Sequence, residues 1–247
     1  MPINDFTYSS YSQLLANIAK SGYTFTNYHD YEKVSNPCIL CHDVDFDMGK
    51  AYKLANIEVE AQYPIYTTYF ILINTNFYNV FSSTVNSIIK KIIKMGHEIG
   101  LHFDETFYSE PTPSQMEKHI QKEVTLLEQI IEEPVRSVSM HRPSKLTLEA
   151  NISIPGVINR YSKIFFNEFK YLSDSRHTWR EDVESIVSMK RHNKLHILTH
   201  PFWYTEGEMS CKEKLSSFIN DANLRRYDEM NKNFSNLNEF FHEDEVM

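Results

Sequence analysis

The segment Pro37-Cys-Ile-Leu-Cys-His-Asp-Val-Asp45 decides how the rest of the chain is interpreted. Its apolar first part is typical of a buried strand, which we expect from Pro37 to Val44. Asp43 and Asp45 alternate and are therefore expected on one face of that strand. Because neighbouring carboxylates repel each other, they indicate a cation or a strong donor between them. A turn or helix cap made by Asp45 and Asp47 is the alternative.

Strand and helix patterns alternate on both sides of this segment. Helices are expected over 12–20, 51–61 and 182–189, with one helix ending at Gly96 and another beginning at a capping box of Ser114 and Glu117. Further strands are expected over 66–73, 98–103, 137–140, 164–172 and 195–199. This order predicts an α/β fold, a distorted (β/α) barrel of about seven strands, with a doubly wound sheet as the alternative.

The composition is typical of a globular protein. The chain has 247 residues, of which 41% are hydrophobic, and 25 Lys and Arg stand against 33 Asp and Glu. We expect one globular domain over 1–247, with 212–247 as a polar helical extension. The net charge of −8 argues against binding to nucleic acid.

Localisation is predicted from two absent patterns and from the number of cysteines. The first residues show no leader pattern, and no apolar run approaches the roughly 20 residues of a membrane span. The three cysteines are an odd number, which favours a reducing compartment over a disulfide framework. The sequence therefore predicts a cytoplasmic protein.

Polar side chains follow the other expected strands at the same end. His102 and Asp104 share a face of the strand that begins near Glu98, and later strand ends carry His141-Arg142, Asp174 and His200. Ligands of parallel α/β folds gather at the carboxyl ends of strands. Carboxylate and imidazole together suit a metal of the zinc, cobalt or iron type, with a second carboxylate as general base and a further His as general acid. The pattern predicts metal-assisted hydrolysis.

Two of the 6 glycines, Gly96 and Gly100, lie beside this cluster. Glycine at a strand position lets another group approach the backbone closely. We therefore expect a neighbouring backbone or a ligand next to Gly100.

From residue 38 to 204, the order of these motifs resembles the polysaccharide deacetylase family, the NodB-like carbohydrate esterases. The segment from His42 to Asp45 is similar to the first motif of that family, which implies Asp43 as general base and Asp45 as metal ligand. The segment from Gly96 to His102 is similar to the second motif, which implies His102 as a ligand.

The later motifs imply the remaining site residues. Arg142-Pro143 resembles the third motif, whose Arg pairs with the general base, here Asp43. Asp174 with Trp179 resembles the fourth, and Leu198-Thr199-His200 resembles the fifth, whose His is the general acid. The resemblance thus implies that Arg142 orients Asp43 and that Asp174 orients His200.

One position departs from the family pattern. Thr106 stands where the family has a second ligand His, four residues after His102. The third ligand is then His141, with Asp104 or water as alternatives. Strand parity favours Asp104, whereas the ligand preference of zinc favours His141.

The resemblance implies a deacetylase that uses a divalent metal, zinc first and cobalt, iron or nickel as alternatives. The expected partner is an acetylated sugar or sugar conjugate, a cytoplasmic precursor of a surface polysaccharide such as O-antigen or capsule, as in lipopolysaccharide biosynthesis. The oligomeric state, including a homo-oligomer, is left open. Two other functions stay open: a degenerate deacetylase that binds sugar without turnover, and hydrolysis of another amide or of a phosphate ester.

Overall fold

The computed structural model describes residues 5–109 and 112–246. The chain divides into two compact units, Met1–Glu206 and Gly207–Met247. In the second unit, helix α8 (Cys211–Asn231) lies where the sequence predicts a polar helical extension. No helix in the described part of the chain is both long enough and apolar enough to cross a membrane.

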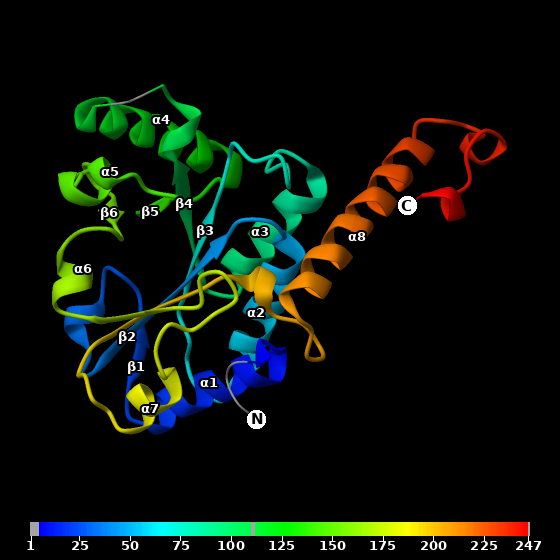
Figure 1. Cartoon of the computed structure of the whole chain (residues 1–247). Coiled ribbons are helices and arrows are strands. Elements are labelled where there is room, and N and C mark those ends of the chain that lie inside the picture. The colour runs from blue at the N-terminus through cyan, green and yellow to red at the C-terminus, as the bar shows by residue number, and fades with distance from the viewer. Residues whose placement is uncertain (1–4, 110–111, 247) are drawn as a thin grey trace. The chain divides into compact units, whose positions relative to one another are not determined.

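A parallel sheet of eight strands forms the centre of the first unit (Figure 1). Its strands are β1 (Thr24–Thr26), β2 (Pro37–Val44), β3 (Thr68–Ile71), β4 (Glu98–Asp104), β5 (Ser137–His141), β6 (Ile158–Asn159), β7 (Lys170–Ser173) and β8 (Leu195–Thr199). The order is β6-β5-β4-β3-β2-β8-β7, with β1 paired to β2.

The strand order is that of an open barrel. β2, the first long strand, pairs with β8, the last, with His42 beside Thr199. Between β6 and β7 no pairing occurs among the described residues, so the barrel is open there. The predicted distorted barrel is confirmed, in place of the doubly wound sheet.

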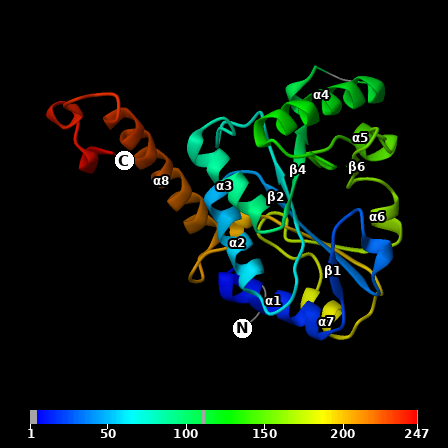
Figure 2. The ribbon, with the colours of Figure 1, turned by 180° about the vertical axis from the view of Figure 1, so that it is seen from behind.

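In the described part of the first unit, seven α-helices accompany these strands: α1 (Tyr8–Lys20), α2 (Met48–Glu60), α3 (Ser83–Lys94), α4 (Pro113–Ile131), α5 (Lys145–Ala150), α6 (Ile164–Asn167) and α7 (Val183–Ser188). Six of them contact one another in the order α7, α1, α2, α3, α4, α5. Seen from both sides, these helices flank the strands as an outer layer (Figure 2). One face of each strand is thereby buried against helices, and the other faces the barrel interior.

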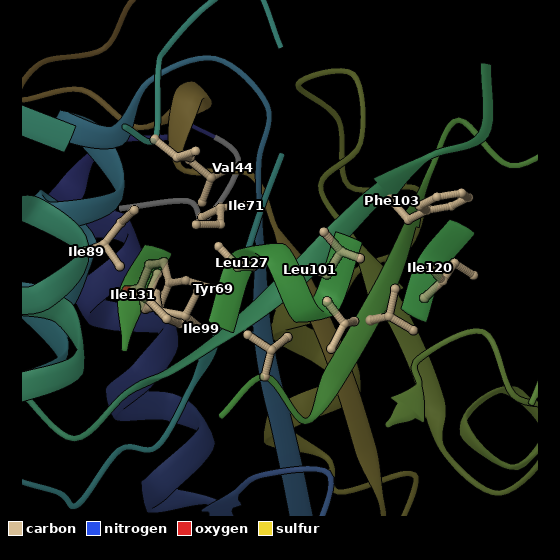
Figure 3. Close-up of a cluster of buried hydrophobic side chains, with 14 of the residues drawn as sticks. Val44, Tyr69, Ile71, Ile89, Ile99, Leu101, Phe103, Ile120, Leu127 and Ile131 are labelled. Carbon is tan, nitrogen blue, oxygen red and sulfur yellow. The ribbon is translucent and has the colours of Figure 1, made fainter. Parts of the chain in front are cut away.

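The largest apolar cluster lies between the strands and this outer layer (Figure 3). On β4, Ile99, Leu101 and Phe103 alternate toward the helices and contribute to the cluster. They meet Ile120 and Leu127 of α4, which are also buried. Burial of each such side chain contributes about 1.5–3 kcal/mol. The intervening residues of β4 face the barrel interior, and this directs His102 away from the apolar cluster.

The expected strand over 164–172 is wrong. Its first part is helix α6, and only β7 is extended. The physical reason is local hydrogen bonding, since the N–H groups of Asn167 and Glu168 donate to the carbonyls of Lys163 and Ile164. The rings of Phe165, in this helix, and Phe169, after it, pack against Tyr31 with centroids 5.9 and 5.3 Å away, and this packing overrides a composition typical of strands. The short strands β1 and β6 were not predicted.

The expected capping box of α4 is also wrong by two residues. Thr112 caps the helix, and its hydroxyl accepts the N–H of Gln115 while the Gln115 side chain accepts the N–H of Thr112. Pro113 occupies the first helical position, where its fixed φ is suitable and its missing N–H costs nothing. The proline therefore sets the start of the helix ahead of Ser114.

The two glycines beside the cluster have separate structural causes. Gly96 follows α3 with a φ of +91°, as expected for a glycine that ends a helix. At Gly100, a Cβ would lie 2.5 Å from Cδ1 of Phe70 and 3.0 Å from the carbonyl oxygen of Ser137. Gly100 therefore makes room for the Phe70 ring and for the neighbouring strand.

Candidate functional site

Three predicted ligands meet at the carboxyl ends of β2, β4 and β5. Asp45 Oδ1 lies 3.2 Å from His102 Nε2 and 3.3 Å from His141 Nδ1. The two imidazole nitrogens are 3.1 Å apart. One ligand atom from each residue thus falls within 4.8 Å of the others, a spacing that suits a single metal ion.

Hydrogen bonding orients His102 for such a role. Its Nδ1 lies 3.3 Å from the carbonyl oxygen of Ser139. Because a carbonyl only accepts, Nδ1 carries a proton, and Nε2 is the ring nitrogen that faces Asp45. A metal-ligating His is commonly oriented in this way, by a hydrogen bond from its other ring nitrogen.

The chemistry of Asp45 also fits a cation. Burial alone would raise its pKa, but the imidazoles of His102 and His141 outweigh that effect and hold the pKa below its usual value. Asp45 Oδ1 is buried and makes no hydrogen bond of good geometry within the described ranges. A buried, ionised carboxylate oxygen facing two imidazole nitrogens fits a divalent metal with an open position.

The structure distinguishes between the two candidates for the third ligand. Asp104 Oδ2 lies 2.5 Å from Arg142 Nη2, and Asp104 Oδ1 accepts the hydroxyl of Thr106 at 2.6 Å. Asp104 is thus engaged by Arg142 and Thr106, and His141 joins the cluster with Asp45. As the third ligand, His141 remains a prediction that this geometry favours.

The expected contact between Arg142 and Asp43 is wrong. Arg142 has a φ of +49°, and its side chain is 64% exposed. In the register of β4 with β5, Asp104 lies beside His141, so the next residue, Arg142, finds Asp104 as its nearest partner. Within residues 5–109 and 112–246, Arg142 pairs with Asp104 and makes no contact with Asp43.

Arg160 takes that contact instead, and sequence reasoning missed it. Its Nη2 lies 3.4 Å from Asp43 Oδ2, and Ser139 Oγ donates to Asp43 Oδ1 over 3.2 Å. Arg160 directly follows β6, a strand of two residues without a detectable periodicity. The segment before Arg160 lies outside every predicted element, so the sequence offers no pattern that would place this arginine at the site.

His200 and Asp174 form the second part of the site. Asp174 Oδ1 lies 2.6 Å from His200 Nδ1, and Asp174 Oδ2 accepts the hydroxyl of Tyr204 at 3.2 Å. Burial lowers the pKa of His200, but the charge of Asp174 and its hydrogen bond outweigh burial, and the pKa rises to about 9. The predicted contact of Asp174 with His200 is present, and it leaves His200 Nε2 available for proton transfer.

A buried polar network supports the two strands that carry Asp43 and His200. His42 Nε2 lies 2.7 Å from Glu58 Oε1, and His42 Nδ1 lies 2.6 Å from Thr199 Oγ1. Glu58 also accepts the hydroxyls of Tyr11, Thr67 and Tyr69. The network joins β2 to β8 immediately before Asp43 and His200.

His97 belongs to the same network. Its Nδ1 lies 2.9 Å from Thr67 Oγ1, and the side chain is buried. His97 therefore takes part in this support and lies outside the cluster of Asp45, His102 and His141.

Together these features define an open parallel α/β barrel with an Asp–His–His cluster and a separate His–Asp pair at the carboxyl ends of its strands. No family model matches the chain, and no curated protein matches it.

Solved structures do match the chain. One is the chitin deacetylase of the fungal pathogen Colletotrichum lindemuthianum, with 12% identity and a TM-score of 0.44 over 81% of this chain and 85% of that one. Another is a family 4 acetyl xylan esterase of Clostridium thermocellum in complex with a cobalt ion, with 14% identity and a TM-score of 0.41 over 76% and 84%. A third is a CE4 family pseudoenzyme of Bacillus anthracis, with 17% identity and a TM-score of 0.38 over 74% and 58%.

Proposed function

We propose that this protein is a metal-dependent hydrolase that removes the acetyl group from an N-acetylated sugar. The observation that carries the proposal is the meeting of Asp45, His102 and His141 beside Asp43, at the strand ends that also present His200. His102 Nε2 lies 3.8 Å from Asp43 Oδ2, so the proposed base adjoins the proposed ligands. The motif order from residue 38 to 204 supports the same function.

Asp45, His102 and His141 would hold the metal. When bound, a divalent ion such as Zn²⁺ supplies Lewis-acid polarisation of the acetyl carbonyl and lowers the pKa of a coordinated water. One carboxylate with two imidazoles suits zinc, and cobalt, iron and nickel are the alternatives.

The remaining residues move and hold protons. Asp43 accepts the proton of the attacking water, and its carboxylate is held by the hydrogen bond from Ser139 and the ion pair with Arg160. His200 donates a proton from Nε2 to the departing amine, because Asp174 fixes the proton on Nδ1. A general base and a general acid at one site fit amide hydrolysis.

The finer part of the proposal concerns the substrate. We infer an acetylated sugar conjugate in the cytoplasm, a precursor of O-antigen, capsule or a related surface polysaccharide. The motif resemblance supports an acetylated sugar, and the cytoplasmic placement is an expectation from the sequence. Acetate release from a nucleotide-linked N-acetyl sugar supports this substrate, whereas activity restricted to polymeric chitin or peptidoglycan contradicts it.

A degenerate deacetylase that binds sugar without turnover is the second candidate. Thr106 favours it, because this residue replaces a ligand of the family pattern and instead hydrogen-bonds Asp104. Against this candidate, His141 would supply a third ligand atom beside Asp45 and His102, in place of the missing family ligand.

A product panel separates the candidates. Zinc-loaded protein is incubated with N-acetylglucosamine oligomers, UDP-N-acetylglucosamine and 4-nitrophenyl phosphate, and acetate and phosphate are quantified. Acetate from a sugar supports the proposal, and phosphate release alone supports the phosphoesterase alternative. Sugar binding by calorimetry without any product supports the degenerate binder.

A further inference from the structure

We propose that Arg160 is the residue that positions Asp43 for catalysis, in the place that the sequence motifs assign to Arg142. This inference rests on the proposed function, because it gives Asp43 the role of general base. It replaces Arg142 by Arg160 as the partner of Asp43, and Arg160 lies outside the motifs.

The placement of Arg160 is the first support. The residue is 0% exposed, and its Nη2 lies 3.4 Å from Asp43 Oδ2. A buried guanidinium is stable only when it is paired, and Asp43 is the carboxylate that it contacts. Ser139 Oγ holds the other oxygen of Asp43 over 3.2 Å. A hydrogen bond on one oxygen and an ion pair on the other restrict the rotation of the carboxylate.

The surroundings of Arg160 keep the guanidinium rigid. Its Nη2 donates to the hydroxyl of Tyr161 over 3.0 Å, and its Nη1 lies 3.7 Å from Cys41 Sγ. Its guanidinium carbon lies 5.8 Å from the centre of the Phe70 ring, on strand β3. The backbone is anchored as well, because the N–H of Arg160 donates to the carbonyl of Val138 at 2.9 Å. A side chain held on all these sides can orient its partner.

Arg142 differs from Arg160 in burial and in the carboxylate that it contacts. Its side chain is largely exposed and its guanidinium binds Asp104 at 2.5 Å. Arg142 also lies close to Thr106 Oγ1, at 3.5 Å, which places it in the group of residues around Asp104. Both residues carry the same guanidinium group, but Arg160 is buried beside Asp43 and Arg142 is exposed beside Asp104. Arg142 therefore serves as a control for Arg160.

The test compares Arg160→Met and Arg160→Lys with Arg142→Met. Zinc-loaded variants are assayed for acetate release from penta-N-acetylchitopentaose, with kcat and KM measured separately. We expect Arg160→Met to lower kcat by about 100-fold, the cost of a misplaced catalytic group, with KM and zinc content near those of the wild type. Arg160→Lys should recover part of kcat because it keeps the charge, and Arg142→Met should lose much less than Arg160→Met.

A double variant separates positioning from a structural role. In an Asp43→Ala background, Arg160→Met should cause no further loss of kcat, since the carboxylate that it positions is gone. If Arg160→Met does not fold, as judged by circular dichroism, the folded Arg160→Lys variant carries the test and should still lose at least tenfold in kcat.

Wild-type kcat in the folded Arg160 variants overturns the inference, and so does a larger loss in Arg142→Met. A further loss from Arg160→Met in the Asp43→Ala background does the same. Wild-type protein that releases no acetate from any N-acetyl sugar overturns the proposed function and this assignment together.

Discussion

Asp174 Oδ1 lies 2.6 Å from His200 Nδ1, and the same carboxylate accepts the backbone N–H of His200 at 3.0 Å. Asp174 is 0% exposed, so its charge acts on the imidazole with little screening. The pair therefore holds His200 in its protonated form well above neutral pH.

The pH dependence of activity should follow this pair. His200 has a pKa raised to about 9 after the charge of Asp174 outweighs burial, and only the protonated form donates a proton. Asp174→Asn should return the pKa toward its ordinary value near 6.5, so kcat/KM at pH 8 should fall roughly 10- to 30-fold more than at pH 6. Tyr204→Phe, which removes one hydrogen bond to Asp174, is the matched control and should shift the alkaline limb less. An unchanged limb in Asp174→Asn argues against His200 as the general acid.

Metal binding should distinguish His141 from Asp104. His141→Ala removes one of three ligand atoms and should lower zinc affinity at least about 10-fold, whereas Asp104→Ala should retain stoichiometric zinc. Zinc content is measured by atomic emission after dialysis against a weak chelator. Loss of zinc from Asp104→Ala alone would show that the third ligand is the other candidate.

The choice between His141 and Asp104 shows which part of the site can be predicted from the sequence. Alternation along a strand placed Asp104 and His102 on one face, but it carried no information about the next strand. The register of β4 with β5 and the salt bridge of Asp104 to Arg142 favour His141, which stays a prediction. Pairing across strands depends on contacts between distant residues, which a single sequence does not reveal.

Contacts between distant residues also explain why the sequence predicted Arg142, and not Arg160, as the partner of Asp43. A motif places Arg142 at the end of β5, yet a positive φ turns its side chain to Asp104. Arg160 enters the barrel from β6, which has two residues and no pattern of its own. By contrast, the boundaries of β2 and β8 were predicted to the residue, since both are apolar runs that end in polar groups.

The buried network around Glu58 should be essential for stability. Glu58→Ala leaves His42 and three hydroxyls without their acceptor and should lower the free energy of unfolding by about 3–5 kcal/mol, with Glu58→Gln costing less. The pKa of Glu58 is held at about 2, because His42 outweighs the effect of burial. Its stabilisation is therefore present above about pH 4.5 and is lost as the pH falls through 2.

Urea unfolding of the metal-free protein tests this. The difference between wild type and Glu58→Gln should be full at pH 6 and should shrink below pH 4. A difference that is independent of pH contradicts the charged state of Glu58.

Ionised Glu123 should lower the stability of the protein, whereas ionised Glu58 raises it. Burial raises its pKa to about 7, more than the hydrogen bond from Tyr108 lowers it. A raised carboxyl pKa costs stability as the pH rises above the unfolded value of 4.5 and through 7. Glu123→Gln should therefore raise the free energy of unfolding by about 1–3 kcal/mol at pH 8 and change it little at pH 4. Thermal unfolding at both pH values measures this, and equal effects at the two pH values contradict the shift.

Acetate release by the metal-stripped protein, titrated with Zn²⁺ in the presence of an N-acetylglucosamine oligomer, tests the central claim most directly. The wild type should gain activity up to one zinc per chain and then level off. Asp43→Ala should bind the same zinc and lose about 100-fold or more of the acetate release. Acetate release that is independent of zinc, or equal in Asp43→Ala and wild type, would contradict the proposed site.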